Sequence, residues 1–373
     1  LFKVNVDSTA IQAIKSIPAR FDATNIVVEQ FQAESKDGVK VPYFVVRQKD
    51  IKFDGTNPTL QYAYGGFQVS MKPGYSGLLG KNWLEQGGVY VLANIRGGGE
   101  FGPNWHQAGL KTKRQVVFDD MIAVAENIIY KKITSAKHLG IMGGSNGGLL
   151  MGVMYTQRPD LWNAVVCQVP LLDMLRYHKL LAGASWVGEY GSPEIANERA
   201  FLEKMSPLHN IEPKGDYPTI MFVTSTKDDR VHPGHARKMA YLLEQYGHDF
   251  EYYENIDGGH SAAANQQETA RRVALEFTYL TEKLMAKMLP VIESTAGQGN
   301  AKVTNPVTGA EDFSFFQEKV PGLYLFVGGR SKDTPAAEAP GHHTPEFQID
   351  ESCMKLGVKL LTNLTIDYMN KHQ

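Results

Sequence analysis

A glycine-rich hexapeptide with a serine inside it carries the strongest chemical signal in this sequence. The segment runs from Gly143 to Gly148 and contains the pattern Gly-x-Ser-x-Gly around Ser145. A serine hydroxyl becomes an effective nucleophile only when it is exposed to substrate and activated by a base. Flanking glycines allow a strained turn from a strand into a helix, with the serine at the turn. We therefore expect Ser145 to attack a carbonyl carbon and the Asn146 amide to donate to the resulting oxyanion.

Two later loops supply the histidine base and the carboxylate that such a serine needs. Asp228 and Asp229 follow the apolar run 219–224, and His260 follows the run 250–253 and two glycines. Both loops come after strands, where the active sites of parallel sheets collect. Of the 11 histidines, only His260 follows a strand and a pair of glycines. Spacing alone does not choose between the two adjacent aspartates.

The elements that position these loops follow from the apolar runs. Apolar runs predict strands at residues 39–47, 60–64, 89–94, 139–142, 163–168, 219–224 and 250–253. The first three runs alternate little between apolar and polar residues, which is typical of strands covered on both faces, and 163–168 and 219–224 are also predicted to be buried. Periodicity and position predict helices at 117–130, 149–156 and 269–285. The alternation of strands and helices predicts an α/β fold with a doubly wound, mostly parallel sheet.

The sequence changes character after Met285. Residues 294–309 are rich in Gly, Thr, Asn and Pro and predict an irregular linker. A strand at 323–327 and a helix at about 350–368 then predict a small α+β appendage. The expected organisation is an N-terminal extension at 1–24, a catalytic domain at 25–285 and a C-terminal appendage at 286–373.

Composition excludes several classes of partner and site. The formal net charge is −2, so no overall field attracts nucleic acid or an anionic membrane, and we expect neither as a partner. The two cysteines, Cys167 and Cys353, cannot form a disulfide framework or a cysteine-based zinc site, and Cys167 lies in an apolar run that predicts burial. The sequence contains no apolar run of membrane-spanning length. The chain begins at Leu1 rather than Met, so we expect a soluble protein in the cytoplasm or, after signal removal, in the periplasm or outside the cell.

Several short stretches, taken together and in order, carry a family resemblance. They lie at 35–38, 64–67, 94–102, 105–106, 118–120, 143–148, 186–191, 228–231 and 259–260. Residues from about 25 to 285 thereby resemble the catalytic domain of the prolyl oligopeptidase family of serine peptidases, which has the α/β-hydrolase fold. The resemblance selects Asp228 rather than Asp229 as the carboxylate of the triad.

The same resemblance implies roles for residues outside the triad. It implies that Tyr64 donates its phenolic O–H as the second oxyanion-hole group and that Arg230 binds a substrate carbonyl. It also implies that Trp186 stacks on the ring of a substrate proline. The remaining implied pocket residues are Phe67, Tyr190 and Val231. Ordinary core packing is the alternative role for each aromatic side chain.

One departure from the family bears on substrate choice. Complete members carry a large β-propeller that caps the active site, and residues 1–24 are too few to form one. We therefore expect an open site. Because esters need less assistance to the leaving group than amides, esterase activity is the alternative to peptidase activity, through the same acyl-enzyme and oxyanion.

The tail has a second resemblance. Residues 309–314 and 342–347 resemble the C-terminal end of metal-dependent amidohydrolases, the family of aminoacylases, in which a histidine at the position of His343 binds a metal. The upstream motifs that supply the other ligands are not found in this chain, and a zinc site needs three or four ligands. We interpret the tail as a remnant or fusion partner that packs on the hydrolase or mediates self-association.

These observations predict a serine hydrolase that cleaves proline-containing peptides or esters through an acyl-enzyme on Ser145, without a cofactor. Three alternatives stay open: a carboxylesterase acting on small or aryl esters, a metal-dependent amidohydrolase that uses the tail, and a non-catalytic fold used for binding.

Overall fold

The structure is a computed structural model. The chain divides into two compact units, Leu1–Met285 and Ala286–Gln373. The residues that the structure describes are 2–16, 18–285, 289–297, 300, 325–330, 333–335, 346 and 349–371.

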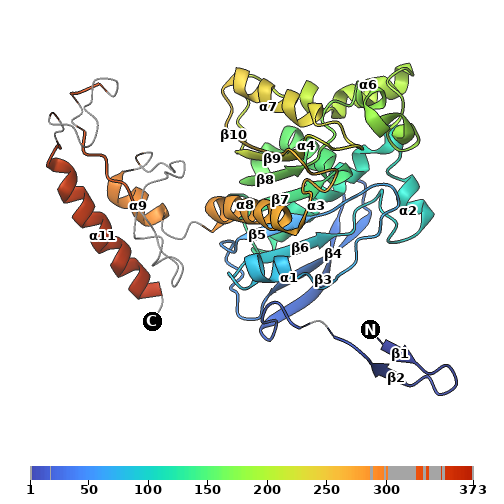
Figure 1. Ribbon diagram of the computed structural model, residues 1–373, viewed down its shortest axis with the longest axis horizontal. Coiled ribbons are helices and arrows are strands. Elements are labelled where there is room, and N and C mark those ends of the chain that lie inside the picture. Colours follow the sequence, from blue (N-terminus) through green and yellow to red (C-terminus); the bar gives the residue numbers. More distant parts are fainter. Residues whose placement is uncertain are drawn as a thin grey trace. The chain divides into compact units, whose positions relative to one another are not determined.

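The first unit is built on a central sheet that has eight strands within the described residues (Figure 1). In spatial order the strands are β10 (Phe250–Asn255), β9 (Ile220–Ser225), β8 (Ala164–Gln168), β7 (Leu139–Gly144), β5 (Thr59–Tyr62), β6 (Val89–Ala93), β4 (Lys40–Gln48) and β3 (Ile26–Glu34). The pairs β3–β4 and β4–β6 are antiparallel, and all the other pairs are parallel. The predicted mostly parallel sheet and its α/β-hydrolase fold are thus confirmed.

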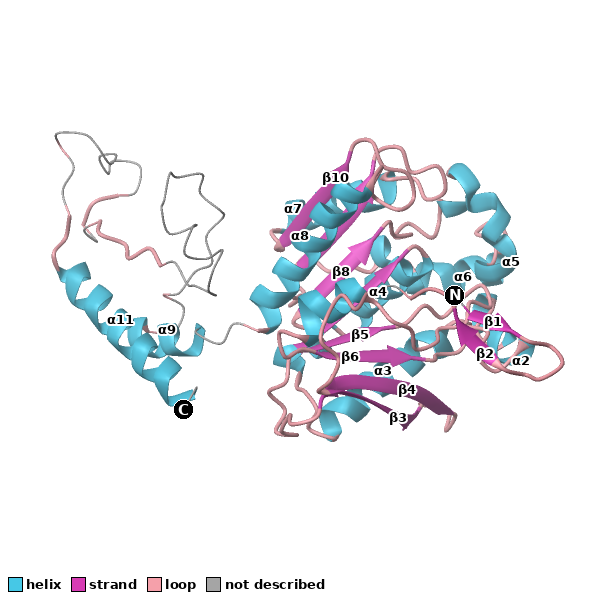
Figure 2. Ribbon diagram, turned by 60° about the horizontal axis from the view of Figure 1, so that its bottom comes forward, coloured by secondary structure: helices cyan, strands magenta, loops and turns pink. Residues whose placement is uncertain are grey.

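Helices cover both faces of this sheet. Because alternate strand residues point to opposite faces, each face has its own core. Val165 and Cys167 of β8 pack in one core with α3 (Gln115–Tyr130), α4 (Asn146–Gln157) and α7 (Gly234–Tyr246). Their neighbours Ala164 and Val166 pack in a second core with α8 (Gln266–Leu284) and with Trp83. Figure 2 shows the helices on the two sides of the strands. Burial on both faces explains why these strands lack apolar–polar alternation.

The strand order reverses direction beside β5. The chain goes from β5 to β6 on one side and later places β7 on the other side of β5. Ligands bind at such a switch point, in the crevice beyond the carboxyl ends of the strands. Tyr64 follows the carboxyl end of β5 and Ser145 follows that of β7, so the topology brings these two residues to the same edge.

The remaining elements of the first unit are short or peripheral. They are the antiparallel pair β1 (Phe2–Val4) and β2 (Ile11–Ala13), and the helices α1 (Gly77–Leu79), α2 (Pro103–Gln107), α5 (Val187–Tyr190) and α6 (Ala196–Met205). Sequence patterns did not predict β3. No helix of the described residues is long and apolar enough to traverse a bilayer.

The second unit contains α9 (Leu289–Ala296) and α11 (Ser352–Lys371), joined by a hydrogen bond from Asn363 Nδ2 to Thr295 Oγ1 (3.0 Å). Two expectations were wrong here. Residues 294–296 belong to α9 rather than to an irregular linker, because the apolar start of this segment favours a helix. Residues 325–327 have no regular structure, although a strand was predicted there, and residues 323–324 lie outside the described residues.

Candidate active site

Ser145 occupies the sharp turn between β7 and α4. Its backbone angles are φ 59° and ψ −116°, a conformation that side-chain-bearing residues rarely adopt and that the surroundings must hold. The neighbouring glycines make the turn sterically possible. A Cβ on Gly143 would lie 2.7 Å from the Gly147 carbonyl oxygen, and one on Gly148 would lie 2.6 Å from the Gln168 carbonyl oxygen. That carbonyl also accepts the Ser145 amide (2.9 Å), which ties the turn to β8.

Two hydrogen-bond donors adjoin the serine. Asn146 is the first residue of α4, so its amide belongs to the N–H groups that have no acceptor within the helix. The Tyr64 phenol lies beside the Ser145 side chain. Burial raises the pKa of Tyr64, while the Ser145 side chain and the positive charges of Arg230 and Arg114 oppose the rise. Tyr64 is therefore protonated at neutral pH and able to donate.

The histidine and one aspartate meet at the ends of β9 and β10. Nδ1 of His260 lies 2.8 Å and 3.0 Å from the two carboxylate oxygens of Asp228. The same carboxylate accepts the amides of Arg230 and Val231, both at 2.9 Å. Asp228 is buried, whereas Asp229 is exposed to solvent. Only Asp228 is thus placed to hold the imidazole with Nδ1–H facing the carboxylate and Nε2 free to accept a proton.

Nε2 of His260 is buried and makes no hydrogen bond to any described residue. The Ser145 side chain lies beside the Tyr64 phenol instead. Catalytic hydrogen bonds in apo enzymes are often long and tighten only when substrate binds.

The other residues implied for the substrate pocket differ in exposure. Arg230 is exposed, and Trp186 and Phe67 are half-buried against the core. Tyr190 and Val231 are almost completely buried. The Tyr190 ring meets Phe67 edge-on, with ring centroids 5.6 Å apart, and its hydroxyl donates to Asn146 Oδ1 (2.9 Å). Tyr190 is therefore linked to the side chain of Asn146, whose backbone amide is expected to serve as an oxyanion donor.

A buried ion pair behind the site was not predicted from the sequence. The Arg114 guanidinium is 1% exposed and donates to Glu189 Oε1 (3.0 Å), the Gly65 carbonyl (3.2 Å) and Asn146 Oδ1. Glu189 also accepts the Phe67 amide (2.9 Å). Arg114 follows Lys111 and Lys113, and such a basic run usually indicates a solvated surface. Nothing in the neighbouring sequence distinguishes the buried Arg114 from the solvated lysines of this run.

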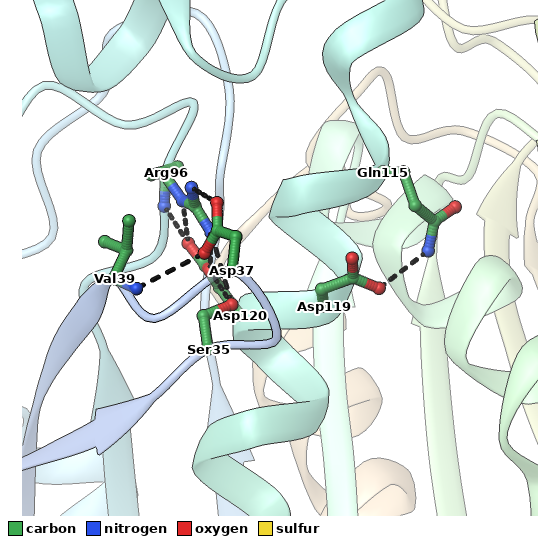
Figure 3. Close-up of polar contacts among 7 residues, drawn as sticks. All are labelled: Ser35, Asp37, Val39, Arg96, Gln115, Asp119 and Asp120. Carbon is green, nitrogen blue, oxygen red and sulfur yellow. Dashed lines mark hydrogen bonds and ion pairs between the residues drawn. The ribbon is translucent and has the colours of Figure 1, made fainter.

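A second buried ion pair supports the glycine-rich loop after β6 (Figure 3). The Arg96 side chain donates to both carboxylate oxygens of Asp120 on α3 (2.6 and 2.9 Å) and also contacts Ser35 and Asp37 in the turn between β3 and β4. The loop that follows packs directly on the Tyr64 loop, since a Cβ on Gly97 would lie 2.5 Å from the Gly65 carbonyl oxygen.

The described residues contain no group of three or more His, Cys, Asp or Glu side chains arranged to hold a metal ion. Residues 309–314 and His343, which carry the resemblance to amidohydrolases, lie outside the described residues. Cys167 is fully buried, as expected, and its burial raises the pKa of the thiol.

Comparison with known proteins gives a consistent result. Residues 79–287 match the prolyl oligopeptidase family. An uncharacterized peptidase of Sinorhizobium fredii is 64% identical over 285 residues, which are 76% of this chain and 39% of that protein. A prolyl endopeptidase of Elizabethkingia miricola is 42% identical over 245 residues, covering 65% of this chain and 35% of that protein.

Solved structures agree with these matches. The structure of a post-proline cleaving enzyme from Rickettsia typhi superposes with a TM-score of 0.73 at 47% identity, over 76% of this chain and 41% of that one. The chain thus spans about two fifths of the length of the relatives that it matches.

Proposed function

Because this chain belongs to the prolyl oligopeptidase family, we propose that it is a serine hydrolase that cleaves proline-containing peptides through an acyl-enzyme on Ser145. The observation that carries the proposal is the paired imidazole and carboxylate of His260 and Asp228, at the same sheet edge as the strained Ser145 turn. One similar structure, from Rickettsia typhi, is described as a post-proline cleaving enzyme, and this similarity supports a proline-containing substrate.

In the proposed mechanism the Ser145 hydroxyl leaves Tyr64, donates its proton to His260 Nε2 and attacks the scissile carbonyl carbon. The unpartnered Nε2 atom is available for this step. Asp228 stabilises the imidazolium that forms, and two backbone amides keep the carboxylate in place. His260 then protonates the leaving amine, and water attacks the acyl-enzyme by the reverse sequence.

The negative charge of the tetrahedral intermediate would be stabilised by the Tyr64 phenol and the Asn146 amide. Both donors lie beside the serine before substrate arrives, so no reorganisation is needed when the charge develops. Arg230 is exposed at the rim of the site, where its donors can bind a second substrate carbonyl. We propose that half-buried Trp186 and Phe67 contact the proline ring. Apart from the hydrolytic water, these steps use side chains and backbone groups of this chain.

The test pairs chemical labelling with hydrolysis. A fluorophosphonate probe should label the wild-type chain at Ser145, and Ser145→Ala should lose both labelling and turnover while the circular dichroism spectrum stays unchanged. EDTA should leave the wild-type rate unchanged if the tail contributes no metal-dependent reaction. A wild-type chain that is not labelled, or a Ser145→Ala variant that keeps its turnover, would refute the proposed nucleophile.

The choice between peptidase and carboxylesterase is a second readout of the same samples. Proline-containing peptide amides and simple aryl esters are assayed in parallel on the purified chain. We expect hydrolysis of both, with Trp186→Ala weakening the peptide reaction more than the ester reaction. Hydrolysis of the esters alone would assign the chain to the carboxylesterase alternative.

A further inference from the structure

We propose that the buried Arg114–Glu189 ion pair is a positioning device that fixes the spacing of the two oxyanion donors, Tyr64 and the Asn146 amide. This inference rests on the proposed function, because it assigns a role within the same site. Arg114 comes from the start of α3 and Glu189 from α5. Among the described residues, neither side chain bonds to a member of the triad. They would act through the residues that they bind.

The loop that carries Tyr64 is held by side chains at three consecutive peptide groups. The Tyr64 carbonyl accepts from Asn146 Nδ2 (2.6 Å), the Gly65 carbonyl accepts from Arg114 (3.2 Å), and the Phe67 amide donates to Glu189 (2.9 Å). Because successive peptide groups are fixed, the origin of the Tyr64 side chain is fixed as well.

The same loop is strained and needs this support. Phe67 and Gln68 have φ values of 53° and 58°, in a region that residues with side chains rarely occupy. Gly66 lies so close to Asn146 that an added Cβ would be 2.6 Å from Nδ2. A strained segment keeps its conformation only when its surroundings hold it, and Glu189 provides one of these contacts.

Asn146, whose backbone amide is the other donor, is held through its side chain. Its Oδ1 atom accepts from both Arg114 and the Tyr190 hydroxyl, and its Nδ2 atom donates to the Tyr64 carbonyl. One buried side chain is therefore linked to both donors. Arg114 holds that side chain directly and the adjoining Gly65 carbonyl at the same time, a double contact that suits the fork of a guanidinium.

Stability alone is a poor reason for burying such a pair. Arg114 is 1% exposed and the Glu189 side chain 6%, so both charges lose their hydration. A buried ion pair replaced by apolar residues of similar volume is often neutral or stabilising. A role in holding the geometry of the oxyanion hole accounts for the pair, and it makes a prediction that a purely structural role does not.

The central variant is Arg114→Met, which keeps most of the volume and removes the fork. We expect kcat for a proline-containing peptide amide to fall about 100-fold with KM changed less than about threefold, because loss of an oxyanion donor acts on the transition state. A proline-terminated peptide aldehyde, which forms a tetrahedral adduct, should bind more weakly by a similar factor. The Kd of the corresponding peptide acid, which forms no adduct, should not change.

A double-mutant cycle with Tyr64→Phe separates the positioning role from a general loss of structure. If part of the Arg114 effect comes from placing Tyr64, the combined loss in the double variant should be clearly smaller than the product of the two single losses, since coupled residues do not add. Multiplicative effects of the two substitutions would overturn the proposal. Unchanged kcat in Arg114→Met would overturn it as well.

Arg47→Met is the matched control. Arg47 also pairs with a carboxylate, Glu29, donates to two backbone carbonyls and lies over an aromatic ring, but it belongs to the β3–β4 edge of the sheet. We expect it to change stability without lowering kcat. A fall in kcat equal to that of Arg114→Met would show that loss of any carboxylate-paired arginine is enough and would overturn the proposal.

Two further results keep the test decisive. If Arg114→Met does not fold, Tyr190→Phe is the second variant, because it removes a single hydroxyl group that donates to Asn146 Oδ1. We expect kcat to fall several-fold, and the fall should not multiply with that of Tyr64→Phe. A wild-type kcat in Tyr190→Phe would overturn the proposal.

Labelling and turnover of the wild-type chain identify which claim fails. Without either, the proposed function itself fails, whereas normal wild-type activity with normal Arg114→Met kinetics refutes only the positioning role.

Discussion

At the scale of single residues, burial distinguishes two aspartates that are equivalent in spacing. Asp228 is buried and accepts hydrogen bonds from His260 and two backbone amides, whereas the adjacent Asp229 is exposed. We expect Asp228→Asn to lower kcat by roughly 10⁴-fold, because an amide in this position favours the wrong imidazole tautomer. Asp229→Asn is the matched control and should stay within about threefold of the wild type, as expected of a change at the exposed surface.

The measurement is the steady-state rate on a peptide amide, with circular dichroism to check the fold of both variants. The larger loss in Asp229→Asn would reverse the assignment of the two carboxylates. Equal losses in both variants would mean that the loop conformation, rather than the buried carboxylate, supports the imidazole.

The sequence was informative about residues whose chemistry needs a distinctive local pattern. Ser145 lies among glycines, and His260 follows a strand and two glycines, so the amino-acid sequence alone was enough to predict both. Arg114 and Glu189 have no such pattern, since their partners lie 49 and 122 positions away in the chain. Their contacts exist only because the fold brings α3, α5 and the loop after β5 together.

At the scale of elements, the strands covered on both faces were predictable, whereas β3, at one edge of the sheet, was not. The apolar runs at β5 to β9 lack alternation because helices bury both faces, and they correspond to the observed strands. β3 lies at the edge of the sheet, and only one of its nine residues is buried, so it has no comparable apolar run. Its position depends on pairing with β4, which is a property of the folded sheet.

One helix that packs on this sheet carries a histidine that should make the unfolding free energy depend on pH. His235 in α7 is 1% exposed, and its Nδ1 atom accepts the amides of Leu172 (3.2 Å) and Asp173 (3.0 Å). Burial, together with the positive charges of Lys238 and His232 and against the negative charges of Asp173 and Asp228, lowers the pKa of His235 from 6.5 to about 4. The folded protein therefore holds this ring neutral over a range where the unfolded chain protonates it.

The sign of the effect follows from linkage. Because the pKa is lower in the folded state, the stabilisation is complete above the unfolded pKa of 6.5 and declines as the pH falls toward 4. Between pH 7 and pH 5, His235 should cost the wild type about 2 kcal/mol of unfolding free energy. His235→Asn keeps an acceptor for the two amides and should lose less stability over this range. Urea unfolding at both pH values provides the measurement, and equal losses in the two proteins would contradict the assignment.

At the scale of the whole molecule, the division at Met285 indicates where the chain can be cut. Leu284 and Met285, at the end of α8, are buried in the core of the first unit, and the Leu284 carbonyl contacts His138 Nδ1 (3.2 Å). α11 exposes apolar side chains, among them Met354, Val358 and Leu361. The first unit therefore keeps its own core to Met285, while apolar side chains of the second unit are exposed.

We expect a chain that ends at Met285 to retain the kcat and the unfolding free energy of the full chain, because no residue of the proposed mechanism lies beyond this point. A chain that ends at Glu282 is the matched control, since it removes the buried Leu284 side chain and should lose about 3 kcal/mol or more of stability. Light scattering on the full and shortened chains reports whether the tail mediates self-association. Loss of turnover in the Met285 chain, with its fold intact, would mean that the tail contributes to the site and would overturn the division at Met285.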